Sequence, residues 1–194
     1  MAIVTATQIT AYTDISATVG TITTSGLIPI VQERINYLTN NYFVSDRIYY
    51  QGNVNFNAAA YTMTASSNLE EIGFLSGDDL YLYGSYRNDG YCNAESVSAE
   101  TITIASSKSV IVEQPSGASI LISLVEWPEA IKYVAAQMVK YDYDDRAAAS
   151  VDVVSETLGP HSITYNRGES VKGSWGYPKA LLDSLAPYTI ARLM

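Results

Sequence analysis

The spacing of apolar residues changes twice along this 194-residue chain, and that change constrains the fold more than any single motif. Residues 27–38 and 128–145 carry apolar side chains three and four positions apart, which is the period of an amphipathic helix. Between them, residues 72–125 contain several short runs with apolar side chains at every second position, which is the period of a half-buried strand. This order predicts a helical domain whose two halves are separated by an inserted β-rich module.

Prolines and an asparagine mark where the helices are expected to begin and end. Asn40 follows the apolar stripe of residues 27–38 and suits the left-handed residue that ends many helices. A second helix is expected from Pro128, because a proline in the first turn loses no hydrogen bond. A last helix is expected to begin at Pro178 and to be stopped or kinked by Pro187.

Short alternating runs bounded by Gly, Asn, Asp and Ser predict the strands of the middle region. These runs are residues 80–83, 102–104, 110–112 and 120–124. The sequence Asn88-Asp89-Gly90 has the residue types of a tight turn. The expected fold class is therefore α+β: a helical domain with packed N- and C-terminal helices and an inserted small β-sandwich or barrel. Its expected parts are residues 1–50, 51–126 and 127–194.

The composition is that of an acidic, folded chain. Hydrophobic residues make up 47% of the sequence, which is enough for a buried core. Acidic residues outnumber basic ones 20 to 11, and the formal net charge of -9 argues against a protein that grips nucleic acid by its phosphates. The single cysteine, Cys92, allows no disulfide within the chain. We find no secretory signal pattern and no long apolar run, so we expect no membrane span and a protein made inside a cell and used or built into a particle there.

The sequence offers little catalytic chemistry. His161 is the only histidine, and it follows Pro160 in a stretch that also contains Ser155 and Glu156. A Ser-His-carboxylate triad needs three side chains that point to one place, which close sequence neighbours seldom do. One histidine and one cysteine are too few for a zinc site, and the Asp142–Asp145 run lacks the later glycine and glutamate of a calcium loop. We therefore expect no enzyme, no metal and no cofactor.

The C-terminal third resembles the head–tail connector, or adaptor, proteins of tailed bacteriophages. In that family a long helix ends in aromatic and acidic residues, a Ser-Glu-x-x-Gly-x-x-Ser loop and a short strand follow, and a Tyr-Pro pair begins the last helix. The matching pieces here are "AIKYVAAQMVKYDYDD", then Ser155, Glu156, Gly159 and Ser162 with Tyr165, then Tyr177-Pro178 and Leu185-x-x-Tyr188. The first 50 residues resemble the family's N-terminal helices. The β-rich middle is a departure, because simpler members have a short loop there.

This resemblance implies a structural protein of the virion neck that assembles in the host cytoplasm. The family forms homo-oligomeric rings, often dodecamers, that dock on the portal protein and receive the next neck or tail protein. Double-stranded DNA passes through the ring, and an acidic lumen would repel its phosphates.

The resemblance and the apolar C-terminus together give three sets of candidate residues. The expected portal contacts are Pro187, Tyr188, Ile190, Leu193 and Met194. The expected contacts between ring subunits are Ser155, Glu156, His161, Ile163 and Tyr165. The expected channel-facing residues are Asp142, Asp144 and Asp145.

Two other function classes remain open at this point. The first is a different structural protein of the virion, such as a tail-completion protein or a capsid decoration protein. A decoration protein would coat capsomers, whereas a connector would close into a ring with a channel. The second is a virion glycan hydrolase that uses two carboxylates, whose activity would be lost on changing one Asp or Glu without loss of the fold.

Overall fold

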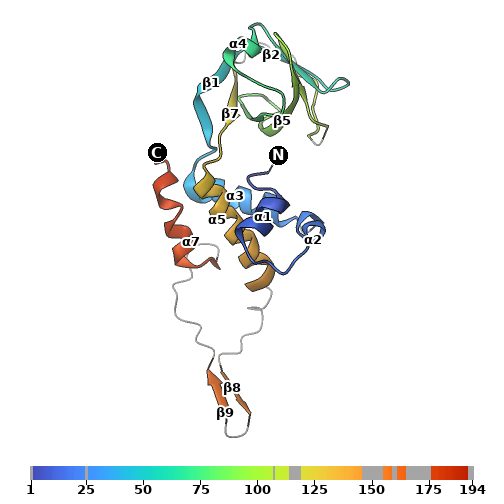
Figure 1. Ribbon diagram of the computed structural model, residues 1–194. Helices are drawn as coiled ribbons and strands as arrows, with labels where there is room; N and C mark the ends of the chain where they lie inside the picture. Colours follow the sequence, from blue (N-terminus) through green and yellow to red (C-terminus); the bar gives the residue numbers. More distant parts are fainter. Residues whose placement is uncertain are drawn as a thin grey trace. The chain divides into compact units, whose positions relative to one another are not determined.

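The computed structural model describes residues 2–24, 26–106, 108–113, 119–145, 155–158, 161–164 and 176–191. The chain divides into two compact units, whose elements are labelled in Figure 1. The first, here called the β unit, is Tyr42–Glu126. The second, here called the helical unit, combines Ala2–Asn41 with Trp127–Met194.

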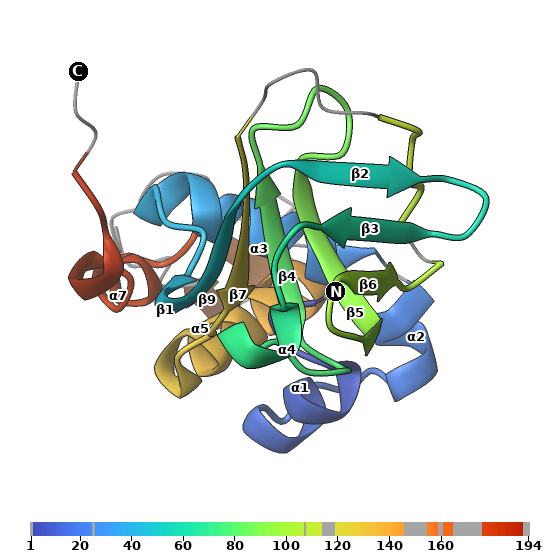
Figure 2. The same ribbon diagram turned by 90° about the horizontal axis from the view of Figure 1, so that it is seen from above.

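Seven strands form one antiparallel sheet in the β unit, in the order β1-β7-β4-β5-β6-β3-β2 (Figure 2). They are β1 (Val44–Gly52), β2 (Val54–Asn57), β3 (Thr62–Ala65), β4 (Asp79–Tyr83), β5 (Gly90–Val97), β6 (Thr101–Ile104) and β7 (Ile120–Val125). A one-turn helix, α4 (Leu69–Ile72), follows β3. A single residue, Asn53, separates β1 from β2, although these are the two edge strands. The sheet therefore curves until its two edges meet at that corner.

Alternate residues of every strand point into one core. All seven strands contribute to this hydrophobic cluster, which includes the fully buried Met63, Leu80, Leu82 and Ile102. The positions between them face away from the core, as the period of two requires. Phe74, also fully buried, joins the same cluster from the segment after α4.

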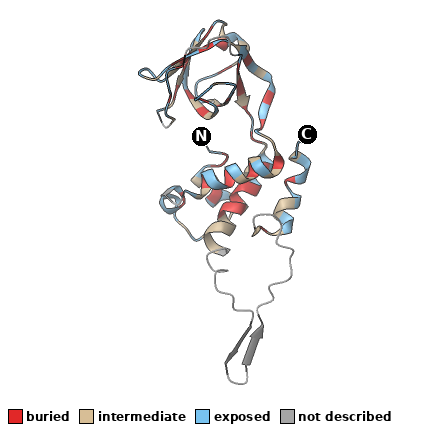
Figure 3. Ribbon diagram, turned by 180° about the vertical axis from the view of Figure 1, so that it is seen from behind, coloured by how far each residue is buried: buried red, intermediate tan, exposed pale blue. Residues whose placement is uncertain are grey.

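The helical unit is built from short helices around α5. Its elements are α1 (Ala6–Tyr12), α2 (Val19–Thr24), α3 (Leu27–Thr39), α5 (Glu129–Lys140), a π-helical turn (Tyr141–Asp145), α7 (Lys179–Asp183) and a 3-10 turn (Ala186–Tyr188). Helices α1 and α3 both pack on α5. The side of α5 that they cover is buried, whereas α3 alternates buried and exposed residues (Figure 3). No helix in the described part of the chain is long and apolar enough to cross a membrane.

The loop that contains the histidine forms a hairpin within the helical unit's part of the sequence. Strand β8 (Ser155–Leu158) pairs with β9 (His161–Thr164) in antiparallel fashion. The register places Glu156 opposite Ile163. The strand expected at "HSITY" therefore has a partner strand in its own chain.

The predicted fold class is wrong. The structure is mostly β, with a seven-stranded antiparallel sheet and few, short helices, and it is not a helical connector domain with terminal helices. The strands begin at Val44, well before the residue near 72 where the alternation becomes visible in the sequence. At the other end, α7 has only five residues. Pro187 lacks the N–H that would bond to the Asp183 carbonyl, so an α-helix cannot continue through it without losing that bond.

One expected strand also does not form. Residues 109–112 have no regular structure, although the Val110 side chain is buried in the core. The backbone pairing in this segment is a single bridge between Glu113 and Phe56. The alternation of Val110 and Val112 arises because one side chain fills the core while the other is exposed, without a ladder of hydrogen bonds.

Candidate functional site

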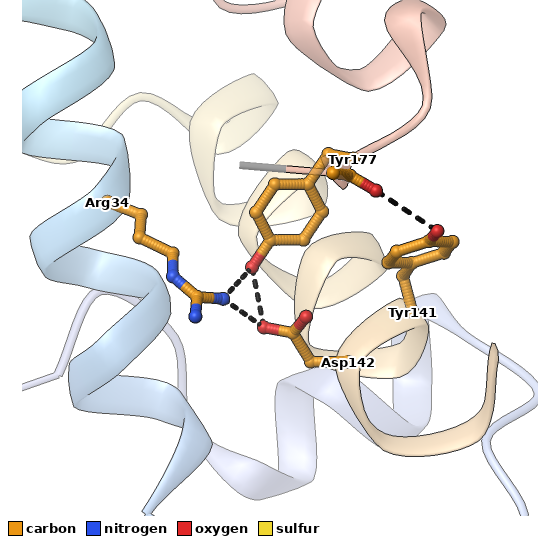
Figure 4. Close-up of polar contacts among 5 residues, drawn as sticks. Arg34, Tyr141, Asp142 and Tyr177 are labelled. Carbon is orange, nitrogen blue, oxygen red and sulfur yellow. Dashed lines mark hydrogen bonds and ion pairs between the residues drawn. The ribbon is translucent and has the colours of Figure 1, made fainter. Parts of the chain in front are cut away.

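A polar cluster joins three segments of the helical unit that lie far apart in the sequence (Figure 4). Arg34 comes from α3, Asp142 from the π-helical turn after α5, and Tyr177 from the residue pair that precedes α7. One guanidinium nitrogen of Arg34 lies 2.6 Å from Asp142 Oδ2 and 2.6 Å from the Tyr177 hydroxyl. The Tyr177 hydroxyl donates to the same Asp142 oxygen over 2.5 Å. We call these three residues the clasp.

Aromatic contacts hold the clasp from one side. The Tyr141 and Tyr177 ring centroids are 5.7 Å apart, and the Tyr141 hydroxyl donates to the Gly176 carbonyl over 3.1 Å. The Arg34 guanidinium carbon lies 5.6 Å from the centre of the Tyr177 ring, which adds a cation–π attraction. These contacts fix the chain at residues 176 and 177 against the end of α5.

The local sequence explains why these side chains meet. The buried stripe of α3 includes Val31 and Ile35, so the half-buried Arg34 lies at the edge of that stripe and reaches across it. After Lys140 the helix widens into the π turn, which changes the direction of the side chains that follow. Tyr177 is fully buried, and a buried phenol needs a hydrogen-bond partner.

Burial is the main cause that raises the pKa of Tyr177 to about 12, and the hydrogen bond to Asp142 adds to it. The phenol is therefore protonated at neutral pH and serves as a donor to the carboxylate. Only 3% of the Asp142 side chain is exposed, against 21% for Arg34. A carboxylate so buried needs its charge partner and its hydrogen bonds. The arrangement stabilises the junction of three segments and presents no nucleophile to solvent.

The expected channel-facing residues have different surroundings. The Asp142 side chain is buried in the clasp, so it does not suit a position on a channel wall. Asp144 accepts a hydrogen bond from Ser16 over 3.1 Å and lies 3.7 Å from the Lys140 ammonium. It is 23% exposed, and its place in a channel stays a prediction. The Asp145 side chain lies outside the described residues.

The expected subunit contacts fall on the β8–β9 hairpin. Ser155 lies opposite Thr164, and His161 lies opposite Leu158. The side chains of this hairpin, and Tyr165 as a whole, lie outside the described residues. Because each strand of a two-stranded ribbon has one paired edge and one outer edge, pairing with a neighbouring subunit remains a prediction for the outer edges.

The expected portal contacts fall on the C-terminal segment, which is attached to the end of α3. The Ile190 N–H donates to the Thr39 carbonyl over 2.8 Å, and the Asn41 side chain donates to the Tyr188 carbonyl over 3.1 Å. Pro187 lies in the 3-10 turn. The backbone of this segment is thus held within the chain, whereas 52% of the Ile190 side chain is exposed. Leu193 and Met194 lie outside the described residues.

A second polar network, which the sequence did not predict, lies in the β unit. Asn88 and Glu113 are both buried, and the Asn88 amide donates to the Glu113 carboxylate over 2.9 Å. That carboxylate also accepts the Tyr86 N–H over 2.6 Å. The Ile111 N–H and carbonyl each bond to the Asn88 side chain over 2.9 Å. The network holds the β4–β5 loop against the segment that ends at Glu113. In the sequence, the turn-like residues around Asn88 were the only indication of it.

The part of the chain that the structure describes holds no group of three or more His, Cys, Asp and Glu residues placed to bind a metal ion. No protein-family model matches this sequence, and neither does any curated protein. The functional assignment therefore depends on the residues and their geometry.

Proposed function

We propose that this protein is a structural subunit of the neck of a tailed bacteriophage. In this role it forms a ring on the portal protein, joins the DNA-filled head to the next neck or tail protein, and lets the genome pass through its channel. The proposal keeps the residue pattern that resembles the head–tail connectors and gives up the helical-domain architecture expected with it.

The clasp is the observation that carries the proposal. Asp142 and Tyr177 are two of the residues on which the resemblance depends, and 34 residues separate them in the sequence. They meet over 2.5 Å and are joined by Arg34 from the N-terminal segment. A motif whose members hold segments together fits a structural subunit, because such a subunit must keep its shape under load rather than transform a substrate.

Two further features support the same role. The backbone of residues 188–190 is anchored to the end of α3 while Ile190 keeps an exposed apolar side chain, which suits a contact with a partner protein. The chain is strongly acidic, with a formal net charge of -9, and an acidic channel wall releases DNA instead of trapping it.

The test is to mix the purified chain with the portal ring of the same phage and to measure the mass of the complex by native mass spectrometry. We expect one complete ring of identical copies of this chain for each portal ring. The matched control is a chain that lacks residues 187–194, which should fold but not attach. A chain that stays monomeric with portal and binds capsid shells instead would contradict the proposal and indicate a decoration protein.

A further inference from the structure

Five tyrosines gather on the outer face of the sheet in the β unit. The register aligns Tyr49 of β1, Ser123 of β7, Tyr81 of β4 and Tyr91 of β5 in one row across four strands. Tyr83 lies two residues beyond Tyr81 on the same side of β4. The neighbouring core residues, such as Leu80 and Leu82, point the opposite way. With Tyr42, which stacks on Tyr81, these residues form what we call the tyrosine face.

The rings of the tyrosine face brace one another. Tyr42 stacks on Tyr81 with the ring centroids 4.5 Å apart and the planes 21° apart. Tyr91 meets Tyr81 edge to face at 4.9 Å, and its hydroxyl donates to the Tyr42 carbonyl over 3.1 Å. Tyr42 is thus held above the sheet by two rings beneath it. A rigid ring loses little entropy when a ligand covers it, so Tyr42 is prepared for binding.

Three of the rings remain open to a ligand. The exposed fractions are 47% for Tyr42, 48% for Tyr49 and 62% for Tyr83. Tyr49 and Tyr81 lie on strands separated by one other strand, which places their backbones about 10 Å apart. Tyr49 and Tyr83 lie in adjacent rows of the same side of the sheet, because Tyr49 is opposite Ser123 and Tyr83 is opposite Leu121. The exposed rings therefore offer flat surfaces with hydroxyl groups at their rims.

The charge of the β unit distinguishes between anionic and neutral ligands. Residues 42–126 contain 3 basic and 10 acidic residues, which gives a formal net charge of -7. None of the basic residues occupies an outward position on β4, β5 or β7, and β1 has one exposed basic residue, Arg47, two positions before Tyr49. A phosphate or sulfate ligand needs several clustered cations, which one arginine at the edge of this face does not supply. The face favours a neutral ligand.

The area of the tyrosine face indicates whether its ligand is an oligosaccharide or a protein. Four strands and five residues of β4 cover about 300 Å² of flat sheet at ordinary strand spacings. A stable protein partner buries about 800 Å² of accessible surface on each side. The tyrosine face alone is smaller than such an interface, and it fits a narrow, extended ligand.

We propose that the tyrosine face binds a neutral oligosaccharide. The C–H faces of pyranose rings would lie on the rings of Tyr42, Tyr49 and Tyr83. Each of these side chains has an apolar ring face and a polar hydroxyl at its edge. The sugar hydroxyls would bond to the phenol groups and to the exposed Gln51 side chain, whose amide both donates and accepts. This activity is independent of ring formation.

The test is binding of the full-length chain to a printed array of neutral and anionic oligosaccharides, followed by calorimetry with the best neutral probe. We expect neutral glycans to bind and sulfated or phosphorylated ones to bind more weakly. The variant Tyr49→Ala/Tyr83→Ala should weaken binding at least about tenfold, because two stacking surfaces are lost. Both side chains are about half exposed or more, so their removal leaves the core intact.

Tyr86→Ala is the matched control, because Tyr86 is 73% exposed but lies in the β4–β5 loop, outside the tyrosine face. It should bind as tightly as the parent. The proposal is overturned if no neutral glycan binds, if anionic glycans bind best, or if the control loses as much affinity as the double variant. It is also overturned if the chain forms dimers that the double variant abolishes, because the face would then be a protein interface.

Discussion

Replacing the buried Asp142 by Ala should destabilise the helical unit. The substitution removes the carboxylate that pairs with Arg34 and accepts from the Tyr177 hydroxyl. Tyr177 is fully buried, and Arg34 cannot replace this acceptor because a guanidinium only donates hydrogen bonds.

The magnitude follows from burial. Breaking a fully buried ion pair costs about 3 to 5 kcal/mol. The Asp142 side chain is 3% exposed, but Arg34 is 21% exposed and regains some hydration when it loses its partner. We therefore expect the free energy of unfolding of the helical unit to fall by about 2 to 4 kcal/mol.

Tryptophan fluorescence during denaturant unfolding measures this change in one unit alone. The two tryptophans of the chain, Trp127 and Trp175, both belong to the helical unit. The β unit has no tryptophan, and tyrosines occur in both units, so its stability is followed by hydrogen exchange of the backbone amides of β1 to β7 in denaturant. The fluorescence midpoint should fall in the Asp142→Ala variant, while the exchange-derived stability of the β unit should stay unchanged.

Asp183→Ala is the control for this experiment. Asp183 pairs with Lys179 on α7, but the side chains are 61% and 57% exposed. An exposed pair of this kind contributes about 0.5 kcal/mol or less. If Asp142→Ala costs no more than Asp183→Ala, the clasp does not hold the three segments together and the reasoning is refuted.

The same cluster predicts a response to high pH. The pKa of Tyr177 is raised from 10.0 to about 12 in the folded chain, first by burial and then by the hydrogen bond to Asp142. The folded state thus holds this proton more tightly than the unfolded state does. The stability that the proton gives is complete below pH 10 and is lost as the pH rises toward 12. Over this range the fluorescence-monitored stability should fall more steeply in the parent than in Tyr177→Phe, and equal slopes would contradict the assignment.

Further predictions concern the β unit and the C-terminal segment. Asn88→Ala should lower the stability of the β unit, measured by hydrogen exchange of its backbone amides, by about 2 kcal/mol, since it leaves buried polar groups unsatisfied, whereas Arg87→Ala next to it should have little effect. Gly84→Ala should cost about 1 to 2 kcal/mol more than Gly77→Ala in the same assay, because both have positive φ but only Gly84 would place a Cβ 3.0 Å from a backbone oxygen. Deleting residues 187–194 should leave the β unit unchanged and abolish attachment to portal-bearing heads in a sedimentation assay, and normal attachment would disprove the role of this segment.

Individual helices were easier to predict from the sequence than the fold class. The stripe of residues 27–38 became α3 (Leu27–Thr39), and Asn40 has the left-handed conformation expected at its end, with φ 49°. A helix boundary depends on neighbouring residues, so a sequence pattern contains most of what determines it. The strand at 120–124 was also found, because its neighbours on both sides of the sheet bury alternate residues.

The first three strands were missed for a physical reason. In β2 and β3 the outward positions carry Asn and Thr, and each strand has only four residues, so the alternation is too short to be distinct. β1 contains an irregularity between Val44 and Tyr49 that shifts its register and breaks the period of two. Without these strands the sequence pattern gives the helices too large a share of the chain, and the predicted fold class was therefore wrong.

The clasp was beyond prediction because it depends on residues far apart. Asp142 was noticed as part of an acidic run and assigned to a channel wall, because a run of carboxylates is usually solvated. Arg34 was assigned no role, since one arginine on a helix has many uses. Only the tertiary structure brings Arg34 and Tyr177, which are 143 positions apart, within 2.6 Å.

The measurement that tests the central claim most directly is an averaged electron cryomicroscopy image of the phage particle that contains this chain, with the chain tagged after residue 194. The proposed function predicts tag density in a closed ring at one vertex of the head, between the portal and the tail, around a channel wide enough for double-stranded DNA. Tag density spread over the capsid surface, or confined to the distal end of the tail, would contradict it.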